Sequence, residues 1–396
     1  MSGAGRVRPL RGSGAIDREF LIRTLADLVR INSINPTLVA GGAGEAEIAA
    51  YVAESLGRVG LEVRKIEPEA GRPSVVGVLR SGRPGRSLML NAHYDTVGVD
   101  GMPEPFSAAI RDGRLYGRGA YDMKGSLAAC MTAAKALADS GALAAGSLVV
   151  AAVADEEYGS IGTAAVIREI KTDAAIVTEP TALNVCLAHK GYLWIEVETE
   201  GRAAHGSRFQ EGIDANMRMG RFLAELDTLE RELRGRPAHA LVGPPSLHAA
   251  MIAGGMGLST YAANCKMQIE RRTVPGETEA QAVGEIQEIV DRLEADDPTF
   301  RAKVRCFFAR EPFEVAADAR IVQVVDRAAE EVLARKAAHF GDTPWMDAAL
   351  LRAAGTETVV IGPKGAGAHA AEEWVDIESV AQLAEILVRA AVDYCG

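Results

Sequence analysis

The chain has 396 residues, which is long for one hydrophobic core and favours two domains. Hydrophobic residues make up 48% of the chain and charged residues 24%, as in ordinary globular proteins in water. The net charge of -11 argues against nucleic acid or an anionic membrane as the main partner.

The cysteines and the N-terminus bear on the compartment. The five cysteines are odd in number and form no CxxC pair, which predicts reduced thiols in a reducing compartment. No apolar run is long enough to span a bilayer. Arg6, Arg8 and Arg11 stand among Gly and Ser with no apolar segment behind them, as in a short flexible leader rather than a signal peptide. We therefore expect a cytoplasmic protein.

The first half of the chain alternates between predicted strands and helices. Helical periodicity covers 16–29 and 45–59, and Gly60 ends the second segment. Strands are predicted at 61–66, 74–79 and 87–92, and a small apolar helix follows at 123–137. A strand at 148–153, a helix at 162–170 and a strand at 174–177 complete the series. This order predicts an α/β fold, with a doubly wound, mostly parallel sheet and helices on both faces.

The pattern changes near Tyr192. Residues 193–200 and 264–271 alternate apolar and polar side chains, as antiparallel strands with one solvated face do. Two helices, at 213–233 and 278–293, and two more strands, at 246–252 and 303–308, belong to the same region. A helix at 319–333, an apolar strand at 358–361 and a helix at 379–394 then resume the first pattern. We expect a discontinuous α/β domain, 1–192 and 308–396, with an inserted α+β domain at 193–307.

Side chains that bind metals follow several predicted strands. His93 follows 87–92, Glu156 and Glu157 follow 148–153, Glu179 follows 174–177, and His369 lies in a Gly-rich loop after 358–361. Sites in open α/β sheets form outside the carboxyl ends of the strands, so these side chains should converge. Imidazole and carboxylate donors suit zinc, or cobalt or manganese in its place.

Each of these residues also has an ordinary interpretation. Asp122, at the start of a helix, could be an N-cap, although a carboxylate shared by two metals would occupy the same place. The acids at 155–157 could form a surface turn, and a histidine in a flexible loop, such as His369, often binds nothing. Jointly the residues are more informative, because like charges placed so close together disfavour ionisation unless cations offset them.

Charge balance separates the roles of the two adjacent glutamates. Asp122, Glu157 and Glu179 would bring three negative charges against the four positive charges of two divalent ions. Glu156 is then left as a general base. Asp95 shares a face with His93 two residues earlier and can hold the tautomer of its imidazole.

Further short motifs join those already described, and the full set, in chain order, is 92–97, 117–125, 155–157, 179–181, 188–191, 204–207, 272–277, and 368–369 with Glu373. In this order the motifs resemble the metallohydrolase family of acetylornithine deacetylase, succinyl-diaminopimelate desuccinylase, aminoacylase and glutamate carboxypeptidase. They span nearly the whole chain. The resemblance implies a two-metal catalytic domain that carries an inserted lid and dimerisation domain.

The resemblance also implies roles for individual residues. The implied metal ligands are His93, Glu157, Glu179, His369 and a bridging Asp122. Asp95 would orient His93, and Glu156 would be the general base.

Three residues of the insert are similar to family residues that act on the substrate. His205 resembles the histidine that reaches a neighbouring subunit's site and stabilises the oxyanion; its ordinary interpretation is a surface turn histidine. Arg272 resembles the arginine that binds the substrate carboxylate, with Arg271 beside it as the other candidate. Asn264 resembles an asparagine that contacts substrate, and a turn asparagine is an equal interpretation.

Departures from the family pattern lie in loops that face the substrate. Arg208 and Phe209 stand where proline is frequent, Lys364 replaces a common glycine, and Met346 stands where threonine is frequent. These departures bear on the choice of substrate more than on the chemistry.

We therefore expect a metal-dependent hydrolase that cleaves the amide bond of an N-acyl amino acid. A hydroxide bridging two metal ions would be the nucleophile, with Glu156 as its base. We expect a small-molecule substrate, no nucleic acid or membrane partner, and a homodimer formed through the insert. One alternative is a cytosolic dipeptidase or carboxypeptidase that uses the same metals. The other is a non-catalytic binding module, which has no need of a general base.

Overall fold

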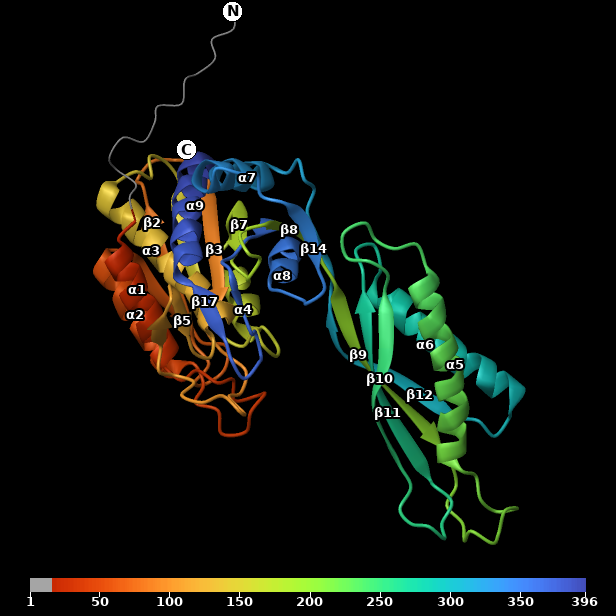
Figure 1. Cartoon of the computed structure of the whole chain (residues 1–396). Coiled ribbons are helices and arrows are strands. Elements are labelled where there is room, and N and C mark those ends of the chain that lie inside the picture. Colours follow the sequence, from red (N-terminus) through yellow and green to blue (C-terminus); the bar gives the residue numbers. More distant parts are fainter. Residues whose placement is uncertain (1–15) are drawn as a thin grey trace, which may run out of the picture. The chain divides into compact units, whose positions relative to one another are not determined.

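The computed structural model describes residues 16–396, which form two compact units (Figure 1). Unit 1 contains the chain up to Leu187 together with Val315–Phe340 and Met346–Gly396, and unit 2 contains Ala188–Glu314 and Gly341–Trp345. The leader predicted around Arg6, Arg8 and Arg11 lies outside the described residues. Within 16–396, no helix has the length and apolar character needed to cross a membrane.

The larger sheet has nine strands in the order β1-β2-β6-β3-β7-β15-β8-β13, with β14 beside β8. Their bounds are β1 Glu62–Ile66, β2 Ser74–Arg80, β3 Ser87–His93, β6 Ser147–Val153, β7 Ala174–Val177, β8 Val185–His189, β13 Phe313–Glu314, β14 His339–Asp342 and β15 Glu357–Val360. The central strands β6, β3, β7 and β15 are parallel. β1, β2 and β8 pair antiparallel, and the short connection between β1 and β2 permits no other pairing. The predicted α/β sheet is confirmed, but it is a mixed sheet in which only the four central strands are parallel.

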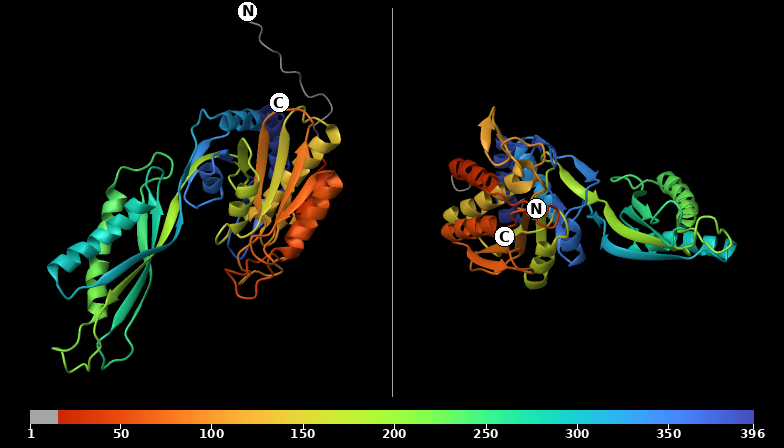
Figure 2. Two further views of the ribbon diagram at one scale, coloured as in Figure 1. Left: turned by 180° about the vertical axis from the view of Figure 1, so that it is seen from behind. Right: turned by 90° about the horizontal axis from the view of Figure 1, so that it is seen from below.

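Helices cover both faces of this sheet, as predicted. Their bounds are α1 Arg18–Arg30, α2 Ala46–Val59, α3 Gly125–Ser140, α4 Ile161–Glu169, α7 Arg320–Leu333, α8 Ala348–Ala353 and α9 Ile377–Cys395. The crossover through α3 runs from β3 to β6, and the crossover through α4 runs from β6 back past β3 to β7. Because such crossovers are right-handed, α3 and α4 lie on opposite faces. The helices α1, α2 and α9 contact α3, whereas α8 contacts α4 (Figure 2).

The small side chains of α3 explain its central position. Its first thirteen residues, up to Leu137, are buried apart from Lys135, and most are Ala, Gly, Ser, Thr or Cys. Small side chains let the helix pack closely between the sheet and its helical neighbours.

A small sheet that the sequence did not predict joins two loops of unit 1. It contains β4 (Ala109–Arg111), β5 (Arg114–Tyr116), β16 (Gly365–Ala366) and β17 (Trp374–Asp376), in the order β16-β17-β5-β4. The pairing of Trp374 with Tyr116 brings the loop that contains His369 next to the segment that leads to Asp122.

Unit 2 is a four-stranded antiparallel sheet covered by two helices. The strands, in the order β10-β11-β9-β12, are β10 Ser246–Gly254, β11 Asn264–Thr273, β9 Gly191–Glu200 and β12 Ala302–Arg310, and the helices are α5 Ala215–Gly235 and α6 Glu279–Asp296. Alternate residues of β9, including Ile195 and Val197, are buried in one hydrophobic core with Phe222 of α5 and Ile286 of α6. The opposite face stays partly exposed, which explains the alternation in the sequence.

Candidate metal centre

The potential metal ligands of unit 1 converge at one edge of the larger sheet. β3 ends at His93, which pairs with Val153, the last residue of β6. Glu156 and Glu157 follow β6, and Glu179 follows β7 on the other side of β3. Because the three strands are parallel, their carboxyl ends lie side by side. The expected convergence is therefore present.

Two groups of three ligands form around a shared aspartate. His93, Asp122 and Glu179 form the inner group, and Asp122, Glu157 and His369 form the outer group, with ligand atoms within 4.8 Å of one another in each. Asp122 places Oδ1 3.2 Å from Nε2 of His93 and Oδ2 3.4 Å from Nε2 of His369. His369 Nε2 also lies 3.0 Å from Oε2 of Glu157. Each group offers one imidazole and two carboxylates, a donor set that fits a divalent ion such as zinc.

The interpretation of Asp122 as a helix N-cap is wrong. It lies in the irregular turn η1 (Ala120–Lys124), and neither this turn nor α3 has a side-chain cap. Its backbone is non-helical, with φ of -116° and ψ of 94°. The carboxylate is free of the helix terminus and points between the two histidines.

The two groups differ in exposure. The His93 side chain is 1% exposed and that of Glu179 is 9% exposed. The His369 side chain is 55% exposed, and its backbone has a positive φ of 61°, a conformation that non-glycine residues adopt rarely. Two of the three inner ligands, His93 and Glu179, are thus buried at strand ends, whereas the outer group depends on an exposed loop for His369.

Burial and mutual repulsion perturb the carboxylates. Burial, reinforced by neighbouring carboxylates, raises the pKa values of Glu156 and Glu179 well above their ordinary range. Burial also raises the pKa of Glu157 to about 7, with Asp122 adding to the effect. Asp122 behaves oppositely: burial opposes ionisation, but hydrogen bonds to the two imidazoles hold its pKa below the ordinary range.

Neighbouring carboxylates favour the charged form of both imidazoles when no cation is bound. Burial opposes the charge on His93, but Glu179 and Asp122 hold its pKa well above the ordinary value. Hydrogen bonds with Asp122 and Glu157 raise the pKa of His369 to about 10. Positive charge on these imidazoles would offset part of the negative charge, as metal cations would do.

The Asp95 carboxylate contacts the acidic turn at 155–157 more closely than it contacts the His93 imidazole. It accepts hydrogen bonds from the backbone N–H groups of Glu156 at 3.1 Å and Glu157 at 3.2 Å, and from the Asn35 side chain at 2.8 Å. His93 Nδ1 lies 3.0 Å from the Asp95 backbone carbonyl and 3.7 Å from its carboxylate. The Asp95 carbonyl can only accept a hydrogen bond, so in the neutral imidazole of His93 the proton lies on Nδ1. Nε2 is then free of a proton and is the ligand atom.

A buried network supports this turn, and sequence reasoning missed it. Arg72 donates to both carboxylate oxygens of Glu45, at 2.6 and 2.7 Å, and to Asp155 at 2.7 Å. Asn35 donates to both Asp155 and Asp95. Asp155 has a positive φ of 68°, so the network holds a rarely adopted backbone conformation. No local sequence pattern marks Asn35 or Arg72, because their partners lie far along the chain.

Glu156 lies beside the inner group and belongs to neither group. Its Oε2 is 3.8 Å from Nε2 of His93, and its side chain is 11% exposed. A carboxylate at this position can accept a proton from a molecule bound between the ligands.

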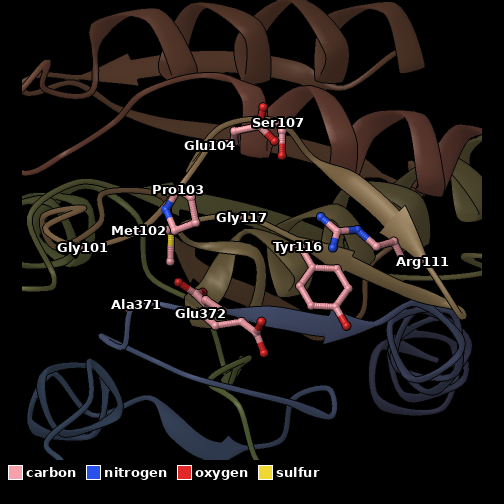
Figure 3. Close-up of a pocket in the computed structure, with 11 residues that line it drawn as sticks. Gly101, Met102, Pro103, Glu104, Ser107, Arg111, Tyr116, Gly117, Ala371 and Glu372 are labelled. Carbon is pink, nitrogen blue, oxygen red and sulfur yellow. The ribbon is translucent and has the colours of Figure 1, made fainter.

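A cavity of about 400 Å³ lies next to the segment that follows His369 (Figure 3). Its lining comes from the loop at 101–107, from Arg111 and Tyr116, and from 371–373. No residue of the inner or outer group lines it, so this cavity is separate from the metal centre.

The remaining predicted site residues lie in unit 2. His205 is exposed, and its Nδ1 is 2.8 Å from the Ser207 hydroxyl. Asn264 begins β11, and its side-chain amide lies 3.4 Å from a carboxylate oxygen of Glu198.

The two adjacent arginines of β11 have different surroundings. Arg271 is buried, and it forms ion pairs with Glu277 at 2.8 Å and Glu285 at 3.3 Å. The Arg272 side chain is 32% exposed, pairs with Glu270 and lies 5.0 Å from the centre of the Tyr192 ring. Only Arg272 therefore has a guanidinium that a ligand can reach.

Two curated relatives align with nearly the whole chain. An acetylornithine deacetylase from Myxococcus xanthus is 30% identical over 386 residues, covering 94% of this chain and 97% of that protein. An N-formyl-4-amino-5-aminomethyl-2-methylpyrimidine deformylase from Bacillus subtilis is 27% identical over 382 residues, covering 88% of this chain and 89% of its own.

Solved structures share the fold at lower identity. Aminopeptidase PepT from Bacillus cereus superposes with a TM-score of 0.78 at 19% identity, over 96% of this chain and 99% of its own. The Bacillus subtilis YXEP protein, described as a dinuclear metal-binding peptidase, superposes with a TM-score of 0.72 at 15% identity, over 95% and 99% of the two chains.

The family match settles the class of protein. The sequence pattern described as peptidase family M20/M25/M40 matches residues 89–393, a span that includes both ligand groups and Glu156. The chain therefore belongs to peptidase family M20/M25/M40, and it is a hydrolase of the metallopeptidase and amidohydrolase kind.

Proposed function

We propose that the chain hydrolyses the amide bond of a small N-acyl amino acid, as a deacetylase or desuccinylase does. The observation that carries this proposal is the position of Glu156, a buried carboxylate beside two ligand groups and outside both. The near full-length similarity to an acetylornithine deacetylase supports the choice of an acylated amino acid.

The ligand groups fit two divalent ions, and we propose zinc, with cobalt or manganese able to replace it. The inner group would hold one ion and the outer group the other, with Asp122 common to both. When bound, such ions would polarise the scissile carbonyl and lower the pKa of a water from about 15.7 to about 7.

The residues of the chain move the proton and hold the geometry. Glu156 accepts the proton of the attacking water and delivers it to the nitrogen of the leaving amine as the C–N bond breaks. Asp95 keeps that base in place through its hydrogen bond with the Glu156 backbone. The same aspartate, through its carbonyl, keeps Nε2 of His93 directed at Asp122.

Residues of unit 2 would recognise the substrate. Arg272 would bind the free carboxylate by a charge-assisted pair of hydrogen bonds, since Arg271 is engaged by two carboxylates. Asn264 would contact the substrate from the start of the same strand. His205 would stabilise the oxyanion of the tetrahedral intermediate.

We further propose that the protein is a homodimer formed through unit 2. The strand β10 is the edge of its sheet, and Met251 and Ile252 on it are 61% and 55% exposed. Exposed apolar edge strands are usually covered in native proteins, and a twofold axis would pair β10 with its copy. In such a dimer His205 would serve the site of the partner subunit.

We propose that the protein is cytoplasmic. Within residues 16–396 the five cysteines form no disulfide, which agrees with a reducing compartment. Fractionation of the host cell, with the protein followed by antibody, tests this assignment.

The proposed function is tested by metal content and a substrate panel. Purified protein, stripped of metal and reloaded with zinc or cobalt, is assayed against N-acetyl, N-succinyl and N-formyl amino acids and against dipeptides. We expect two ions per chain and turnover of at least one N-acyl amino acid. Turnover of dipeptides alone would replace the proposal by the dipeptidase alternative. Two bound ions without turnover of any amide would favour a binding module.

A further inference from the structure

One buried carboxylate outside the metal centre holds the backbone that carries Asp122. Glu373 is 2% exposed, and its Oε1 accepts hydrogen bonds from the N–H groups of Tyr121 at 2.9 Å and Asp122 at 3.0 Å. Its Oε2 accepts a third, from the N–H of Gly119 at 2.9 Å. One side chain thus positions most of the turn on which the shared ligand lies.

Arg118 ties this carboxylate to the loop of His369. Its Nη1 donates to Glu373 at 2.7 Å, and its Nη2 donates at 2.9 Å to the backbone carbonyl of Ala370, the residue after His369. Its Nε donates to the carbonyl of Gly98 at 2.9 Å. A guanidinium can reach three acceptors in fixed directions, which a lysine ammonium on a flexible stem cannot.

The two residues therefore clamp together the loops that supply two of the three outer ligands. His369 and Glu373 belong to one loop between β16 and β17, and Asp122 belongs to the other. The loop of His369 is also tight at its start, because a Cβ on Gly367 would lie 1.8 Å from the Glu372 carbonyl oxygen. The spacing between the shared aspartate and the exposed histidine is set by these contacts.

We propose that Glu373 and Arg118 are positioning residues that set the affinity of the outer group for its metal ion, with a smaller effect on the inner group. The inner group has independent support, because His93 ends β3 and Glu179 is the second residue after β7. Of the three outer ligands, only Glu157 follows a strand of the larger sheet, and His369 is exposed. The inference rests on the proposed two-metal centre.

The test compares metal retention in Glu373→Gln and Arg118→Lys with retention in the wild type. Glu372→Gln is the matched control, since Glu372 is adjacent, exposed and outside both ligand groups. Each zinc-loaded protein is dialysed against metal buffers of graded free zinc, and bound zinc is measured by mass spectrometry. Thermal melting and the visible spectrum of the cobalt-loaded form are recorded beside it.

We expect the wild type and the control to hold two ions over the same range of free zinc. Glu373→Gln removes one carboxylate acceptor and the negative charge that pairs with Arg118. The affinity for one ion should therefore fall, so that roughly 10- to 100-fold more free zinc is needed to keep it bound. The other ion should shift by less than about threefold. Arg118→Lys should show the same one-ion loss, and the cobalt spectrum should lose the contribution of a single ion.

Equal weakening of both ions, or unchanged binding of both, would overturn the inference and leave the clamp with a role in folding only. If Glu373→Gln fails to fold, the result of Arg118→Lys decides. Failure of the wild type to bind two ions would instead refute the proposed function, so the two failures are distinguishable.

Discussion

Replacing Glu156 by glutamine tests the assignment of the general base. Glutamine has nearly the same shape, and the Asp95 carboxylate still accepts the backbone N–H at this position, so the acidic turn should keep its conformation. The amide cannot accept the proton of the attacking water. General-base catalysis contributes about 100- to 10,000-fold, so kcat should fall by that factor, equivalent to about 3 to 5 kcal/mol of activation free energy.

Metal binding should survive the same change, because Glu156 belongs to neither ligand group. Glu157→Gln is the matched control: it alters the next residue in the same turn, and it should cost the outer ion because it removes a ligand. Metal content by mass spectrometry, measured with steady-state kinetics on a substrate from the panel, separates the two variants. Retention of more than about a tenth of the turnover by fully loaded Glu156→Gln would refute the assignment.

The same variant should be more stable than the wild type when both are free of metal. Burial, with Glu179 nearby, raises the pKa of Glu156 above its ordinary value of 4.5. Above that value the unfolded chain loses the proton that the folded state retains, so this residue costs stability increasingly as pH rises. Glutamine removes the cost. The melting temperature of metal-free Glu156→Gln should exceed that of the wild type at neutral pH, and the difference should disappear in acid.

Three further predictions concern the metals, the dimer and the substrate. Zinc binding to the metal-free protein at neutral pH should release protons, because His369, with a pKa of about 10, must lose a proton to become a ligand. The buffer takes up these protons, so the heat of binding should differ between buffers of different ionisation enthalpy. An identical heat in all buffers would contradict the prediction. Inactive His205→Ala and inactive Glu156→Ala subunits, mixed and allowed to exchange, should recover part of the activity, and no recovery after demonstrated exchange would exclude a role across subunits. Arg272→Met should raise KM with little loss of folding stability. Arg271→Met should lower the unfolding free energy by about 3 kcal/mol, because it removes the buried partner of Glu277 and Glu285 and leaves them only Arg236. If kinetics instead showed the raised KM in Arg271→Met and calorimetry showed the lost stability in Arg272→Met, the roles of the two arginines would be exchanged.

The sequence predicts the convergence of candidate ligands best where they follow apolar strands. His93 ends β3, Glu157 lies four residues after β6 and Glu179 lies two residues after β7, and parallel strands end at one edge of the sheet. Asp122 and His369 each look like an ordinary cap or loop residue when taken alone, and they are informative only together with the other ligands and with the family resemblance.

The supporting contacts could not be predicted because they join distant parts of the chain. Arg118 and Glu373 are 255 residues apart in sequence, and Arg72 and Asp155 are 83 residues apart. Hydrophobic periodicity describes only a short window of sequence, so it gives no information about contacts between residues this far apart. The small sheet around β17 was missed because its strands are only two or three residues long and because the pairing of β17 with β5 joins distant parts of the chain.

The division of labour between the units has a consequence for how such proteins diversify. Every residue of the two ligand groups belongs to unit 1, whereas His205, Arg272 and Asn264 all belong to unit 2. If unit 2 recognises the substrate as proposed, substitutions there can change which molecule is recognised while the ligand groups of unit 1 stay unchanged. Two relatives of similar identity are named an acetylornithine deacetylase and a pyrimidine deformylase, which is the kind of difference that such independent variation would produce.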